Sequence, residues 1–289
     1  MSFDQLLTLG KQILCALFAL FLPWAGIGVP EPGALGPQAA DTVRIMSFNV
    51  RDGEFDREEI VPYVVADYLP DSVGFQECEG TWYLTLDTYL PYYTIVGVGR
   101  LTGLPLIGES TAIMYRNDKY KLVDSGTFWL SEMPFMVSMG WDANHPRTCT
   151  WVVLENLETG EQYAHVNTHL DNKGALAREK GLQMVLEKAE SFDMPVVVTG
   201  DFNFSKNSDV YNKLITDGKF EDVSEIAMDK DSGCTYHNYS GSTAGEPIDY
   251  ILVNEKTENV LSYKIMREKY NDRYPSDHYP IYADVVLGK

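Results

Sequence analysis

Several apolar runs of this sequence end in side chains that can hold a metal ion, bind phosphate or move a proton. The run from Val196 to Thr199 is short and β-branched, which indicates a buried strand, and Asp201 and Asn203 follow it directly. Packing gives no reason for polar residues there, whereas rigid strands are good supports for a site. The residues placed in this way are Asn49, Glu77, His169, Asp201, Asn203, Asp249, Asp277 and His278.

Glu77 follows the apolar residues 73–75, where a buried carboxylate is costly unless a cation compensates it. The carboxylate and amide oxygens of such residues suit Mg²⁺ or Mn²⁺, whereas zinc favours His and Cys. For Glu77 taken alone, an arginine partner or a helix cap is an equally good explanation.

Two histidines have local context that favours chemistry. His169 and His278 could each donate to a phosphate oxygen or transfer a proton, with a carboxylate such as Asp249 fixing the ring tautomer. The other three histidines are predicted to be structural, and they are His145, His165 and His237.

The elements that must position these residues are core strands with helical segments between them. Residues 57–69 and 173–192 have helical patterns, so a layered mixed α/β fold is expected. The apolar runs that predict strands span residues 42–50, 72–77, 110–116, 148–155, 161–170, 195–203, 247–253 and 279–287. Their polar ends are expected to gather at one edge of the sheets.

The amino-terminal segment differs in kind from the rest of the chain. Residues 12–30 contain no charged residue, and a stretch rich in Gly, Pro and Ala follows them. We expect a signal peptide or membrane anchor with its tether over residues 1–40, and one catalytic domain over 41–289. The protein is therefore predicted to be secreted or anchored outside the cytoplasm, with residues 12–30 as the membrane contact, and to be a monomer.

Charge and cysteine content exclude some functions and weaken others. The formal net charge of −19 repels polyanions and provides no basic face for nucleic acid, although a metal ion can invert the local sign at a site. No C-x-x-C pair exists, so a zinc knuckle is excluded, and Cys78, Cys149 and Cys234 are predicted to be small core residues.

Six motifs in order carry a resemblance to a known family. FNV, FQE, NTHLD, GDFN, IDYILV and SDHYP, which span residues 42–287, resemble the endonuclease/exonuclease/phosphatase superfamily. That resemblance implies a deoxyribonuclease I-like fold, which is a four-layer α/β/β/α sandwich of two packed mixed sheets with the site at one edge. It also implies Glu77 as the principal metal ligand, with Asn49 nearby and Asp277 contributing from the far side.

The same resemblance implies roles around the phosphate. Asp201 would orient or deprotonate the attacking water, and Asn203 would hold a phosphate oxygen. His169 and His278 would stabilise charge on the phosphoryl oxygens, with Asp249 supporting His278. On an extended backbone Asp201 and Asn203 would share a face, with Gly200 allowing a turn.

Three further positions follow from the resemblance or depart from it. Arg147 matches a phosphate-contacting arginine of several branches, and Tyr115 lies where some members place an active-site tyrosine. Abasic-site endonucleases carry an acidic residue where this chain has Arg51, which counts against DNA repair and against a second carboxylate ligand there.

The sequence thus predicts an Mg²⁺-dependent or Mn²⁺-dependent hydrolase that uses water to attack a phosphate ester. The ester is open: an extracellular nuclease acting on DNA or RNA and a phospholipid or sugar-phosphate hydrolase are alternatives. A non-catalytic phosphate-binding protein is the alternative of another class. Specificity is expected to lie in residues 97–109, 131–147 and 232–246.

Overall fold

The computed structural model of the protein describes residues 38, 41–52, 57, 59–105, 107–216 and 218–288. The predicted signal or anchor over residues 12–30 lies outside them, and so does all of the tether except Gln38. Among the described residues, no helix has the length and apolar character needed to cross a membrane. The boundary at residue 41 stays a prediction.

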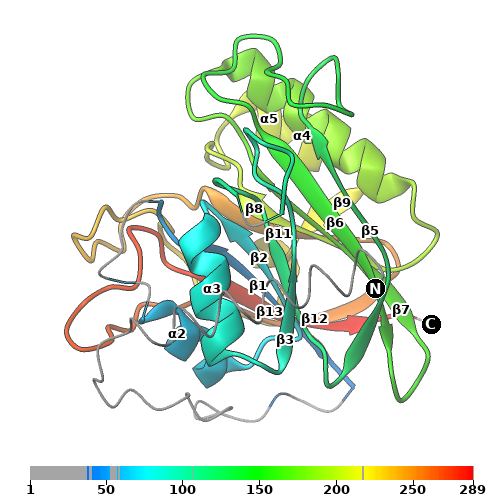
Figure 1. Ribbon diagram of the computed structural model, residues 1–289, viewed down its shortest axis with the longest axis vertical. Coiled ribbons are helices and arrows are strands. Elements are labelled where there is room, and N and C mark those ends of the chain that lie inside the picture. The colour runs from blue at the N-terminus through cyan, green and yellow to red at the C-terminus, as the bar shows by residue number, and fades with distance from the viewer. Residues whose placement is uncertain are drawn as a thin grey trace, which may run out of the picture.

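Two mixed sheets form the centre of the fold (Figure 1). The first has the order β10 (Asp229–Lys230), β12 (Thr257–Ile265), β13 (Ile281–Leu287), β1 (Val43–Asn49), β2 (Ser72–Gln76), β4 (Ile113–Arg116) and β3 (Tyr93–Val96). The second has the order β5 (Tyr120–Trp129), β6 (Thr148–Asn156), β7 (Gln162–His169), β8 (Val196–Asp201), β11 (Asp249–Asn254) and β9 (Phe220–Asp222).

Helices cover the outer faces of the paired sheets. Figure 1 shows α2 (Val61–Tyr68) and α3 (Gly80–Tyr89) on one side and α4 (Ala175–Glu190) on the other. Short helical segments lie between β8 and β10, namely α5 (Asp209–Tyr211), the π-helix η1 (Asn212–Thr216) and α6 (Val223–Ile226).

Strand alternation explains the layers. In β1, Met46 and Phe48 pack with α2 and α3, whereas Ile45 packs between the two sheets. A third apolar cluster lies between α4 and the second sheet and includes Leu182 and Val198. The predicted four-layer sandwich is confirmed.

Strand pairing brings the polar strand ends to one edge. Parallel β1 and β2 place Asn49 opposite Gln76, the residue before Glu77. In the second sheet, Asp201 lies opposite both His169, across a parallel pair, and Asp249, across an antiparallel pair. The predicted gathering at one edge of the sandwich is confirmed.

A buried polar network joins the two sheets. Nδ1 of His165 lies 2.8 Å from Ser72 Oγ, and its Nε2 lies 2.8 Å from Thr199 Oγ1. Thr199 donates in turn to Asn167 Oδ1 at 2.9 Å. The sheets approach closely here because Gly74 has no side chain: a Cβ on it would lie 2.1 Å from Thr199 Oγ1. His165 is therefore structural, as predicted.

The sequence patterns missed strands that are short or exposed. Residues 121–124 of β5 are all exposed, so β5 carries no run of apolar side chains that would indicate a core strand. The strands missed are β3, β5, β9, β10 and β12.

Candidate active site

A cavity of about 500 Å³ opens at the edge where the strand ends gather. Its walls carry carboxylates, arginines and histidines, which suits a small anionic ligand better than an apolar one. The lining residues are Arg51, Asp52, Glu77, Arg100, Glu109, His145, Arg147, His169, Asn172, Asp201, Asn203, Tyr236, Asn238, Ile248, Asp277 and His278.

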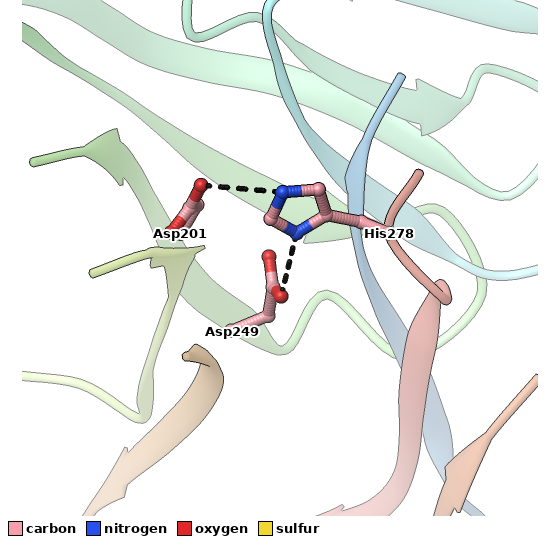
Figure 2. A group of neighbouring side chains, drawn as sticks. All are labelled: Asp201, Asp249 and His278. Atoms are coloured by element: carbon pink, nitrogen blue, oxygen red, sulfur yellow. Dashed lines mark hydrogen bonds and ion pairs between the residues drawn. The ribbon is translucent and has the colours of Figure 1, made fainter. Parts of the chain in front are cut away.

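His278 is held between two carboxylates (Figure 2). Its Nδ1 lies 2.9 Å from Oδ2 of Asp249, and its Nε2 faces Oδ2 of Asp201 at 3.8 Å. Burial opposes the charge, but Asp249 and then Asp201 outweigh it and raise the pKa of His278 to about 10. The ring is therefore a cation at neutral pH, and Asp249 fixes its orientation as predicted.

Asp201 is the shared centre of the polar groups. Asn49 Nδ2 donates to its Oδ2 at 3.1 Å, and Nε2 of His169 lies 3.4 Å from the same oxygen. Burial, with the Asp249 carboxylate adding to it, raises the pKa of Asp201 to about 7. A carboxylate with a pKa near neutrality is suited to accept a proton from water.

His169 reaches the cavity from the end of β7 as a neutral ring. Burial, together with the charge of Arg147, holds the pKa of His169 well below its ordinary value. Among the described residues, none is within hydrogen-bonding distance of its Nδ1, and the nearest carboxylate oxygen, Oε1 of Glu109, is 3.9 Å away. The ring thus has a free polar atom beside the cavity.

Glu77 and Asp277 flank a position that accommodates positive charge. The guanidinium of Arg51 lies between them, 3.6 Å from Oε2 of Glu77 and 3.7 Å from Oδ2 of Asp277. Burial raises the pKa of Asp277 and Glu77 adds to this, although His278 and Arg51 oppose it. All donors are oxygens, so the residues fit a hard divalent cation such as Mg²⁺ or Mn²⁺.

Asn49 supports this acidic pair more than it faces the cavity. Its Nδ2 also donates to Oε1 of Glu77 at 3.1 Å, and its Oδ1 accepts from the Arg51 amide at 3.0 Å. Both ends of the amide are therefore used within the protein, and Asn49 orients Glu77.

Ligand atoms of Asp201, Asp249 and His278 also lie within 4.8 Å of one another, a spacing at which a metal ion could bind. Nδ1 of His278 is already engaged by Asp249, and the ring is a cation, so proton exchange is the better description of this group.

Arg147, the predicted phosphate contact, lines the cavity, and Asp171 positions it. Nε of Arg147 lies 3.5 Å from Oδ2 of Asp171, and its side chain is nearly buried. The Asp171 carboxylate also accepts from the amides of Lys173 and Gly174 at 3.0 and 2.7 Å. His145 lies beside them in the cavity wall, with its Nε2 2.8 Å from Nδ2 of Asn144, and its structural role stays a prediction.

Sequence reasoning missed the pair formed by Arg100 and Glu109. Both line the cavity and are joined by a salt bridge, and burial raises the pKa of Glu109 to about 7. Within the described part of the chain, Nε and Nη1 of Arg100 are buried with no hydrogen-bond partner. The only signal was their place in the predicted specificity loop, residues 97–109, because neither residue ends a strand.

The predicted geometry of the GDFN turn was wrong, although Asp201 and Asn203 do both line the cavity. The backbone is not extended at Asn203, which has φ 54°, and its amide donates to Oδ1 of Asp201 at 2.9 Å. Its Nδ2 donates to the Leu170 carbonyl at 3.1 Å. Gly200 does not make the turn; it allows close packing, since a Cβ there would lie 2.4 Å from the Thr168 carbonyl.

Left-handed backbone also occurs at Arg51 and Glu77, with φ of 63° and 57°. Non-glycine residues adopt this conformation at a cost, and such strain tends to persist at functional sites.

Tyr115 does not reach the cavity. It lies opposite Ser72 in the β2–β4 pair and packs in the apolar cluster between the sheets. Ser72 begins β2 and Gln76 ends it, so Tyr115 is four residues, or about 13 Å, from the strand end that carries Glu77. The expected active-site role of Tyr115 is therefore wrong.

Comparison with known proteins agrees with this geometry. The sequence model of the Endonuclease/Exonuclease/phosphatase family matches residues 46–278, and the chain belongs to this family. A search of curated proteins found no match.

Solved structures give the same assignment. A mannosyl-6-phosphatase from Bacteroides thetaiotaomicron is 30% identical, with a TM-score of 0.81 over 85% of this chain and 100% of its own. An endonuclease/exonuclease/phosphatase from Bacteroides vulgatus is 34% identical, with a TM-score of 0.79 over 85% and 99%. The human Nocturnin catalytic domain, which holds a sulfate anion, shares the fold at 20% identity, with a TM-score of 0.65 over 86% and 94%. The chain is thus similar to phosphoester hydrolases.

Proposed function

We propose that the protein is an Mg²⁺-dependent or Mn²⁺-dependent hydrolase of phosphate esters that uses water as the nucleophile. The observation that carries the proposal is the cavity itself. In a chain of net charge −19, one cavity collects the cationic His278, three arginines and the base candidate Asp201. Five carboxylates also line the cavity, and a divalent cation would add to the positive groups that offset them, so that a compact anion can bind there in an acidic protein.

The residues divide the reaction between them. Asp201 accepts a proton from water as the water oxygen bonds to phosphorus and the bond to the leaving alcohol breaks. His278 and Asn203 donate to the phosphoryl oxygens, His169 adds a neutral donor, and Arg147 holds the phosphate. A divalent cation held by Glu77 and Asp277 would polarise the phosphoryl group and neutralise charge on the leaving oxygen.

The first test is hydrolysis of p-nitrophenyl phosphate, bis-(p-nitrophenyl) phosphate and natural esters, with and without EDTA. We expect activity to depend on added Mg²⁺ or Mn²⁺ and to fall about a hundredfold or more in Glu77→Gln. Glu187→Gln, on the exposed face of α4, is the matched control. Metal-independent turnover, or full activity of Glu77→Gln, would overturn the proposal, and calorimetric binding without turnover would favour a binding protein.

A sugar phosphate monoester is the second candidate for the substrate. It is supported by the similarity to the mannosyl-6-phosphatase, which this chain matches over all of that protein's length. Competition between hexose 6-phosphates and bis-(p-nitrophenyl) phosphate would test it. A nuclease is less favoured because the acidic surface repels polyanions, and intact plasmid and RNA at millimolar Mg²⁺ would exclude it.

We further propose that the protein works outside the cytoplasm or at a membrane, as a monomer. The uncharged segment of residues 12–30 supports the proposed location. Fractionation of cells that express the full chain, with light scattering of the purified protein, would test both points.

A further inference from the structure

Two uncharged segments form an exposed apolar surface beside the cavity. Residues 101–108 and 133–141 contain no Asp, Glu, Lys or Arg, although 22% of the chain is charged. Phe135 is 81% exposed and Leu101 63%. We call this surface the apolar rim, and its members are Leu101, Leu104, Ile107, Met133, Phe135, Met136, Val137 and Met139.

Trp129 holds the two segments together. Its Nε1 donates to the Arg100 carbonyl at 2.7 Å, and its amide donates to the Pro134 carbonyl at 2.8 Å. A Cβ on Gly103 would lie 3.4 Å from the Trp129 ring and 3.8 Å from Val137 Cγ2, so the two segments lie side by side. The rim is one surface and not scattered side chains.

The rim is continuous with the cavity wall. The first segment lies between Arg100 and Glu109, both of which line the cavity, and the Arg100 amide donates to the Glu109 carbonyl at 2.8 Å. The second segment leads to His145 and Arg147, which also line it. A ligand whose phosphate lies in the cavity can therefore extend its remaining part over the rim.

We propose that the apolar rim docks on a lipid surface and presents an amphiphilic phosphate ester to the cavity. This inference rests on the proposed function. The rim is uncharged in a chain of net charge −19, which suits neutral or zwitterionic lipid better than a second, equally acidic copy of the chain. Its side chains are Leu, Ile, Val, Met and Phe, which can enter the boundary between the headgroups and the acyl chains of a membrane.

An environment-sensitive fluorophore on the full chain tests docking directly. We would label Phe135→Cys in a Cys15→Ser background, since Cys78, Cys149 and Cys234 are buried. Phosphatidylcholine vesicles are expected to shift its emission to the blue. The same label at Met228→Cys, 77% exposed and outside the rim, should not shift. Gln38, just after the amino-terminal segment, donates to Asp71, which lies at the end of the first sheet away from the cavity. A shift of a probe at the rim would therefore report contact of the rim with lipid and not only attachment through residues 12–30.

Activity provides the second readout. Phe135→Ser with Met136→Ser should lower hydrolysis of phosphatidic acid in phosphatidylcholine vesicles about tenfold, because two side chains lose their burial in lipid. Hydrolysis of soluble p-nitrophenyl phosphate should not change, and Leu157→Ser, an exposed residue elsewhere, should change neither. Loss of soluble turnover in the native protein would instead overturn the proposed function.

Three results would overturn the docking proposal. The first is no shift at position 135 with vesicles, and the second is equal loss on soluble and vesicle-borne esters. The third is a shift that depends on protein concentration without vesicles, which would identify the rim as a contact between copies of the chain.

Discussion

His165 and His169 lie four residues apart on β7, on the same strand face, yet their surroundings are opposite. Both ring nitrogens of His165 have partners inside the protein, at 2.8 Å each. His169 has an unpartnered Nδ1 within the described structure and borders the cavity. Burial lowers the pKa of both rings, that of His165 to about 3, so both are neutral at pH 7.

The difference distinguishes buried polar side chains that stabilise the fold from those that can bind a ligand. A buried polar group whose hydrogen bonds are all internal stabilises the packing of the sheets. One with a free atom beside a cavity is ready for a ligand and costs stability until the ligand arrives. Arg100 resembles His169 in this respect, with Nε and Nη1 unpartnered among the described residues.

The largest effect should come from Asp201→Asn, which removes the proposed base. We expect activity on p-nitrophenyl phosphate to fall about 10²-fold to 10⁴-fold, because an amide cannot accept the proton from water. Far-UV circular dichroism should match that of the native protein. Retention of more than a tenth of the native rate would show that another group takes the proton.

Replacing each of the two histidines by alanine tests the difference between them. His169→Ala should lower activity about 10²-fold to 10³-fold with little change in stability. His165→Ala should lower the free energy of unfolding by about 2–4 kcal/mol, because Ser72 and Thr199 each lose one buried hydrogen bond and a void is left between the sheets. Its folded fraction should keep native turnover. Urea denaturation and kcat/KM, measured for both variants, test these two expectations. Equal changes in stability and equal changes in kcat/KM would show that the two histidines do not differ in role.

The pH dependence of stability should reveal the free energy that burial of the Asp201 carboxylate costs. Burial and Asp249 raise its pKa from 3.8 to about 7, so the folded state binds this proton more tightly than the unfolded state. The resulting stability is full below about pH 3.8 and is lost as the pH rises through about 7. The side chain of Asp201→Asn stays neutral at every pH. The free energy of unfolding of this variant, relative to that of the native protein, should therefore rise by a few kcal/mol between about pH 3.8 and about pH 7. Thermal denaturation in EDTA measures it, and a constant difference across the range would contradict it.

The smallest effect is expected at Tyr115, on the side of the fold away from the cavity. Tyr115→Phe should leave kcat/KM unchanged and lower stability by about 1 kcal/mol through the lost hydrogen bond to Thr94. A fall in kcat/KM without a change in stability would restore the active-site role that the structure does not support.

The strand ends were predictable from the sequence, and the contacts around them were not. Apolar runs with polar residues at one end located Glu77, Asp201 and His278, since the pattern of a strand is a local property. Arg100 and Glu109 were not predicted as site residues because they lie on a loop that only tertiary packing brings to the cavity. The error at Tyr115 has the same cause: its place along β4 depends on the register with β2.

The sequence by itself determined the buried core strands, the family motifs and the set of groups available for phosphate chemistry. These follow from side-chain type and short-range spacing, which the chain carries before it folds. Only the tertiary structure decided which of those groups have free hydrogen-bonding atoms. It gave both ring nitrogens of His165 partners between the sheets, and among the described residues it left buried nitrogens of His169 and Arg100 without partners. It also placed the uncharged segments of the rim next to Arg100. The hydrogen-bond partners and the burial of a side chain depend on residues distant in the sequence. They determine the pKa values of the site and which of its polar atoms lack a hydrogen bond.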